Sequence, residues 1–161
     1  MSPFGRSLWT AAVAFVVAAA FAQPAPRLLF EHVRPYLGVP YLWGGTDPSK
    51  GLDCSAFVRL VYGELGVELP RTSRQQYAAF PRVTDRLMPG DLLYFSEDGR
   101  RITHVALYLG DGYIAHAAQS RGKVTIEPAR NLAAIYVGAN RPWARAPFLQ
   151  ADGGIGVLYS Q

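Results

Sequence analysis

The sequence predicts an α+β fold, with helices in the first half of the chain and an antiparallel sheet in the second. Apolar residues over positions 54–65 recur at the i, i+3, i+4, i+7 spacing of a helix that buries one face. From position 92 onward, short apolar segments alternate with glycine-containing turns, a pattern typical of hairpins. Helices followed by an antiparallel meander favour a layer of helices packed on one face of the sheet. The 161 residues suit one domain with its own core.

The first 22 residues have the features of a signal peptide. Arg6 forms a short charged region, an uncharged apolar run extends from Leu8 to Phe21, and Ala20-Phe21-Ala22 fits the small-x-small rule for cleavage. The run is about 14 residues long, shorter than the roughly 20 that a membrane-spanning helix requires. We therefore expect an exported protein, periplasmic, wall-associated or extracellular, with no stable membrane anchor after cleavage.

The rest of the chain is expected to form one domain over residues 23–145, followed by a tail or edge segment over residues 146–161. Leu28–Leu37 is predicted as a helix that Pro35 weakens. The glycine- and proline-rich segment 38–51 is predicted as a loop. Loops of this kind often line sites when a rigid scaffold holds them.

The helix predicted over residues 54–65 begins at the only cysteine of the chain. Asp53 stands at the N-cap position, and Gly66 stands where the helix should end. A thiol in the first turn meets unpaired backbone N–H groups and the positive end of the helix dipole, and both stabilise a thiolate. The sequence therefore predicts a lowered pKa for Cys54 and a nucleophilic role.

A second helix is predicted to begin at Thr72 or Ser73 and to run through Phe80. The predicted strands that follow are Leu92–Phe95, Ile102–Leu109, Tyr113–Ala117, Val124–Glu127 and Ile135–Ala139.

His104 and His116 lie on the two arms of the hairpin around residues 110–112. If all three residues form the loop, Leu109 pairs with Tyr113, and both imidazoles lie on one face as diagonal neighbours, about 7–8 Å apart at Cα. A two-residue turn shifts the pairing by one residue and sends them to opposite faces. The predicted arrangement therefore depends on a three-residue loop, for which glycine at the third position is favourable.

Together these residues satisfy the requirements of thiol catalysis. Cys54 is predicted as nucleophile, His104 as the base that later protonates the leaving amine, and His116 as the group that orients His104. The Cys54 N–H and the Tyr41 hydroxyl are the predicted oxyanion donors. From these residue types alone, unrelated core or surface roles and a metal site remain open.

At these residues the sequence resembles the NlpC/P60 family of papain-like cell-wall peptidases. The blocks that carry the resemblance are Pro40-Tyr41-Leu42-Trp43-Gly44-Gly45 with Asp53-Cys54-Ser55, Leu69-Pro70-Arg71-Thr72-Ser73 with Gln76, Pro89-Gly90-Asp91-Leu92, and His104 through Gly110. They occur in the family's order and span about residues 36–141, so the resemblance makes residues 23–145 a catalytic domain of this family.

The resemblance implies a papain-like α+β fold and a cofactor-free, metal-free cysteine peptidase of peptidoglycan. Its substrates would be stem or cross-bridge peptides, often cut between γ-linked D-Glu and a diamino acid. Asp53 and Ser55 match positions that recognise the N-terminal side of the peptide in some relatives, although Asp53 as a plain helix cap stays open. Arg71 is expected in a structural salt bridge rather than on a substrate carboxylate, and Trp43 is expected to pack the wall of the site.

The charge of the chain argues against nucleic-acid binding, and several other functions stay open. The net charge is +4, and no basic run is longer than Arg100-Arg101, so the chain offers no footprint for nucleic acid. An amidase or acyltransferase using the same Cys-His groups is one alternative. A Cys-His-His zinc site or a non-catalytic wall-binding protein is another. The sequence identifies no regulatory partner.

Overall fold

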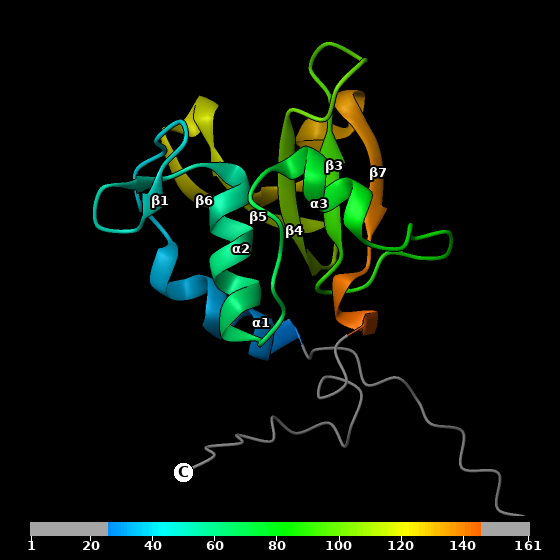
Figure 1. Ribbon diagram of the computed structural model, residues 1–161, viewed down its shortest axis with the longest axis horizontal. Helices are drawn as coiled ribbons and strands as arrows, with labels where there is room; N and C mark the ends of the chain where they lie inside the picture. Colours follow the sequence, from blue (N-terminus) through cyan, green and yellow to red (C-terminus); the bar gives the residue numbers. More distant parts are fainter. Residues whose placement is uncertain (1–25, 146–161) are drawn as a thin grey trace, which may run out of the picture.

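The structure is a computed structural model that describes residues 26–145 (Figure 1). The predicted signal peptide, residues 1–22, and the predicted tail, residues 146–161, lie outside the described residues. The helices are α1 (Pro26–Val33), α2 (Cys54–Glu64) and α3 (Ser73–Ala79), with 3-10 helices η1 (Arg34–Tyr36), η2 (Gln119–Arg121), η3 (Ala129–Ile135) and η4 (Pro142–Arg145). The strands are β1 (Thr46–Asp47), β2 (Gly51–Leu52), β3 (Leu92–Phe95), β4 (His104–Gly110), β5 (Tyr113–Ala118), β6 (Lys123–Pro128) and β7 (Tyr136–Asn140). The predicted α+β class is confirmed.

The main sheet has five antiparallel strands in the order β6-β5-β4-β3-β7. Strands β3 to β6 form the predicted meander, but the prediction is wrong for the last strand, because β7 returns to the opposite edge beside β3 (Figure 1). Ala139 of β7 packs there in an apolar cluster with Leu93 and Phe95. The Asn140 side-chain amide donates to the Phe80 and Pro81 carbonyls, so apolar burial and buried hydrogen bonds together fix this edge.

The three α-helices cover one face of this sheet (Figure 1). The apolar stripe of α2, with Phe57, Val58 and Val61 fully buried, packs on β4 and β5. Tyr77 of α3 lies over Tyr94 of β3 with ring centroids 4.9 Å apart. Within residues 26–145, no helix is both long and apolar enough to cross a membrane.

The first predicted helix is shorter than expected and divided in two. α1 ends at Val33, and the chain continues as η1, which contains Pro35. A proline inside a helix removes a backbone donor and clashes with the preceding turn. The two segments are tied to α2 through Glu64, which lies 2.9 Å from the His32 ring and accepts a hydrogen bond from the Tyr36 hydroxyl.

The predicted helix caps are confirmed. The Asp53 carboxylate accepts the Ala56 N–H at 2.7 Å, and α2 ends two residues before Gly66, which has a left-handed φ of 73°. Thr72 and Gln75 form a reciprocal capping box at the start of α3. Local sequence therefore determines where both helices begin.

The β4–β5 hairpin reaches the predicted register by a different route. Its turn contains only Asp111 and Gly112, both with positive φ, and Gly110 rather than Leu109 pairs with Tyr113. The loop therefore has two residues, not the three on which the predicted arrangement depended. A register shift at Leu109 supplies the extra residue.

Beyond this bulge the strands pair as the three-residue loop would have required, with Leu107 opposite Ala115 and Tyr108 opposite Ile114. His104 and His116 consequently share a face of the sheet, as predicted. The two-residue turn alone would have placed the two imidazoles on opposite faces of the sheet. The bulge adds one residue and returns them to the same face.

Candidate active site

Cys54 is the first residue of α2 and is 8% exposed. The backbone N–H groups of Val105, Ser55 and Cys54 itself face its sulfur. Val105 follows His104 at the start of β4, so the packing of α2 on β4 brings the thiol to the end of the strand that carries the histidine.

The two imidazoles are hydrogen-bonded to each other. His104 Nε2 and His116 Nδ1 are 2.7 Å apart, and the rings meet edge to face with centroids 5.0 Å apart. The other side of His104 packs on Phe95, its partner across β3 and β4. Because Nε2 of His104 is used in this bond, its Nδ1 is the nitrogen left for the thiol.

Burial works against charge on both groups in the substrate-free protein. It raises the pKa of Cys54 to about 11, although the Val105 N–H opposes the shift. Burial, reinforced by the neighbouring His116, lowers the pKa of His104 to about 3. The predicted low pKa of Cys54 is therefore wrong for the substrate-free site, because desolvation of the thiolate outweighs the helix N-terminus. The resting pair is a neutral thiol and a neutral imidazole.

This ionisation state predicts the pH dependence of alkylation at Cys54. The thiolate is the reacting form, and its fraction grows about tenfold per pH unit below the thiol pKa. We expect the rate of iodoacetamide labelling, followed by mass spectrometry, to rise steadily from pH 6 to pH 10. With only one cysteine in the chain, no other thiol contributes. A rate that levels off below pH 8 would instead indicate a thiolate–imidazolium pair in the free protein.

The loop that carries Tyr41 is folded against the start of α2. At Gly45 a Cβ would lie 2.4 Å from the Gly51 carbonyl oxygen, so only glycine permits this approach. The Asp53 N–H donates to the Gly45 carbonyl at 3.1 Å. Burial, together with the charges of Cys54 and Asp53, raises the pKa of Tyr41 to about 12. Its hydroxyl therefore stays protonated and available as a donor near the sulfur.

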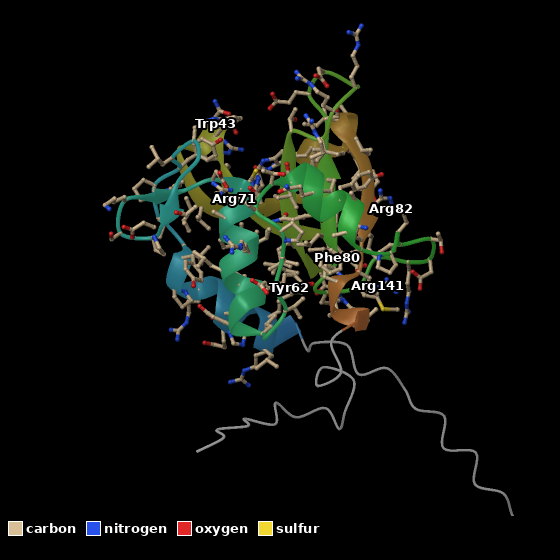
Figure 2. All side chains as sticks on the ribbon, viewed as in Figure 1. Trp43, Tyr62, Arg71, Phe80, Arg82 and Arg141 are labelled. Atoms are coloured by element: carbon tan, nitrogen blue, oxygen red, sulfur yellow. The ribbon has the colours of Figure 1, made fainter. Side chains whose placement is uncertain are left out.

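Arg71 links this loop to α2 (Figure 2). Its guanidinium donates to both Asp53 carboxylate oxygens, at 3.1 and 2.7 Å. It also donates to Ser55 Oγ at 3.0 Å and to the Gly44 carbonyl at 3.1 Å. The predicted salt bridge is confirmed, and Asp53 serves as helix cap and ion-pair partner at once.

Trp43 does not pack against the site, contrary to the prediction. Its side chain projects from the loop beyond Arg71 and is 81% exposed (Figure 2). Gly44 follows it with a left-handed φ of 73°, and this turn leaves the indole pointing outward.

Glu127 was not identified from the sequence and lies next to His116. Its Oε1 is 2.8 Å from His116 Nε2, and its residue is 8% exposed. The available signal was a charged residue ending the otherwise uncharged strand Val124–Glu127. Its position beside His116 depends on the pairing of β5 with β6, which sequence reasoning did not determine.

The geometry gives little support to a zinc site at these residues. His104 Nε2 and His116 Nδ1 bond to each other, and His116 Nε2 bonds to Glu127. Across the described part of the chain, no group of three His, Cys, Asp or Glu side chains is arranged to hold a metal ion.

Comparison with known proteins points to one family. Residues 38–141 match the NlpC/P60 family. The chain is 41% identical over 99 residues to the gamma-DL-glutamyl hydrolase of Bacillus subtilis, covering 60% of this chain and 24% of that protein. It is 38% identical over 122 residues to the peptidoglycan endopeptidase RipB of Mycobacterium tuberculosis, covering 68% of this chain and 50% of that protein. It thus spans half or less of these two relatives.

Among solved structures, an NlpC/P60 family protein from Bacillus cereus superposes with a TM-score of 0.68 at 35% identity, covering 76% of this chain and 41% of that one. The matched segment contains Cys54, His104 and His116 together with the loop of Tyr41. On sequence and on fold, the chain belongs to the NlpC/P60 family.

Proposed function

We propose that the chain is a cysteine endopeptidase that hydrolyses peptide bonds in peptidoglycan stem or cross-bridge peptides. One observation carries the proposal: a lone cysteine at a helix N-terminus adjoins the strand of a histidine whose far nitrogen is bonded to a second histidine. A nucleophile, a base and an orienting group are the parts that thiol-based acyl transfer requires.

In this mechanism the Cys54 sulfur attacks the scissile carbonyl while its proton passes to Nδ1 of His104. The Cys54 N–H, one of the first-turn donors of α2 that have no partner within the helix, and the Tyr41 hydroxyl donate to the developing oxyanion. His104 then gives its proton to the leaving amine, and water hydrolyses the thioester. Since thiol and imidazole start neutral, proton transfer accompanies attack.

The bond we propose joins the γ-carboxyl of D-Glu to a diamino acid. The relative from Bacillus subtilis, named a gamma-DL-glutamyl hydrolase, supports the γ-glutamyl side of this choice. Asp53 and Ser55 are proposed to recognise the N-terminal side of the peptide. Their side chains are held by Arg71, so this ion pair would orient them for the substrate. Trp43 is exposed on the same loop and precedes Gly44, whose carbonyl Arg71 holds, so it is a proposed contact for the same ligand.

We further propose that residues 1–22 direct export and are cleaved, and that residues 23–145 act as the catalytic domain. A substrate in the cell wall requires the enzyme to act outside the cytoplasm. Mass spectrometry of the secreted protein, with Gln23 or its pyroglutamate form expected first, identifies the cleavage position.

Mass spectrometry of purified wall fragments tests the proposed reaction. We expect the protein to release products that carry a new γ-carboxyl on D-Glu and a new amino group on the diamino acid. Cys54→Ala serves as the control for contaminating hydrolases. Cleavage between the glycan lactyl group and the peptide would identify an amidase instead. Transfer of the peptide to an added amine without hydrolysis would identify an acyltransferase.

A further inference from the structure

Glu127 ends a line of hydrogen bonds that begins at His104. His116 Nε2 lies 2.8 Å from Glu127 Oε1, and the other carboxylate oxygen accepts from Arg121 at 3.0 Å and from Asn131 at 2.9 Å. His116 is 2% exposed and Glu127 is 8% exposed, so neither exchanges these partners freely with water. A buried carboxylate held by three polar groups has one orientation.

The protonation states at this end of the line are defined. Burial opposes ionisation of Glu127, but hydrogen bonds from Asn131, Arg121 and His116 together lower its pKa, so it is a carboxylate at neutral pH. Burial lowers the pKa of His116 despite the carboxylate, so its ring is neutral and carries a single proton.

These states leave one arrangement of protons. A carboxylate only accepts hydrogen bonds, so the proton of His116 is on Nε2, facing Glu127. His116 Nδ1 is then bare and accepts from His104, whose own proton must be on Nε2 at 2.7 Å. The Nδ1 of His104 is consequently bare. Glu127 thus selects, through His116, the tautomer that His104 needs in order to act as a base toward Cys54.

We propose that Glu127 is a positioning residue that sets the tautomers of both His116 and His104 and keeps His104 Nδ1 free to accept the thiol proton. This inference rests on the proposed function, because it takes Cys54 as nucleophile and His104 as base. The negative charge of Glu127 also stabilises His104 once protonated. Arg121 and Asn131 act through Glu127 by holding the carboxylate in place.

The substitution Glu127→Gln tests the tautomers with almost no change of shape. The two donors, Arg121 and Asn131, require the amide oxygen on their side, which turns the NH₂ toward His116 Nε2. His116 must then carry its proton on Nδ1 and donate to His104 Nε2. His104 is left with its proton on Nδ1, where it can no longer accept one.

Nitrogen-15 NMR of labelled protein reads the tautomers without substrate. Bare and protonated ring nitrogens resonate far apart, and the chain has only three histidines. His32, bonded to Glu64 rather than to either catalytic histidine, is an internal reference. We expect the His104 proton on Nε2 in the wild type and on Nδ1 in Glu127→Gln. We expect kcat to fall about 10²–10⁴-fold, because a base in the wrong tautomer cannot accept the thiol proton.

The double variant Glu127→Gln/Asn131→Asp is the matched rescue. An acceptor at position 131 takes the glutamine NH₂ and returns its oxygen to His116, and Arg121 pairs with the new carboxylate. We expect the wild-type tautomers and most of the activity to return. A role in stability alone predicts instead that Glu127→Gln, the isosteric change, is nearly as active as the wild type.

The inference fails if Glu127→Gln leaves the His104 proton on Nε2, or if its kcat lies within about twofold of the wild type. It also fails if the double variant restores the tautomers but not kcat. Failure of the proposed function is a separate result, since it appears as a wild-type protein that cleaves no wall peptide while the NMR tautomers are as described.

Discussion

Replacing Cys54 with alanine is expected to abolish peptide hydrolysis while leaving the fold intact. No other thiol exists in the chain to form the acyl-enzyme, so we expect kcat to fall by at least about 10⁴-fold. The lost group is one sulfur at a helix end, and alanine is a good helix former. The free energy of unfolding should therefore fall by only about 1 kcal/mol. Product release from wall peptides and thermal unfolding measure the two effects.

Cys54→Ser is the matched control for this change. It keeps a polar atom in the same place but supplies a far weaker nucleophile, so we expect it to be inactive yet to bind substrate. Turnover near the wild-type rate in either variant, with the native melting temperature, would remove Cys54 from the mechanism.

Replacing His104 with alanine is expected to cost more activity than replacing His116. Without His104 no group accepts the thiol proton or protonates the leaving amine, and we expect kcat to fall about 10³–10⁴-fold. Without His116 the base remains but loses its orienting partner, and we expect a fall of about 10–100-fold. Steady-state kinetics on a defined wall peptide give the comparison.

Stability must be measured beside these rates, because His116 is the more buried of the two. Its removal leaves a cavity and takes away the hydrogen-bond partner of Glu127 Oε1, so His116→Ala is expected to melt earlier than His104→Ala. His116→Gln keeps a polar side chain of similar size and is the control for lost volume. Equal losses of kcat in folded variants would show that the base and the orienting group cannot be told apart. A larger loss for His116 would make His116 the base and His104 the orienting group.

The features that were predictable arise from short stretches of chain. Asp53 caps α2 because its side chain reaches an N–H three residues later, and Thr72 caps α3 for the same reason. The shared face of His104 and His116 was predicted with the wrong loop. The turn has two residues, and the bulge at Leu109 compensates. Bulge positions depend on how both strands pack, so periodicity alone does not locate them.

Other features required the packed structure. The sequence placed a thiol at the positive end of a helix, but its ionisation depends on how much water α2 and β4 exclude. The return of β7 to the edge beside β3 depends on the burial of Ala139 against Leu93 and Phe95, residues far from it in the sequence. The family resemblance led us to expect Trp43 in the wall of the site, yet its side chain is exposed and is followed by the turn at Gly44.

The sequence alone determined the family and the starts of α2 and α3, and it selected Cys54, His104 and His116 as the candidate site, because these follow from local hydrogen bonds and linear motifs. Only the tertiary structure decided the charge state of the thiol–imidazole pair and the link from His116 to Glu127. Both depend on burial and on contacts between strands, which no local pattern specifies.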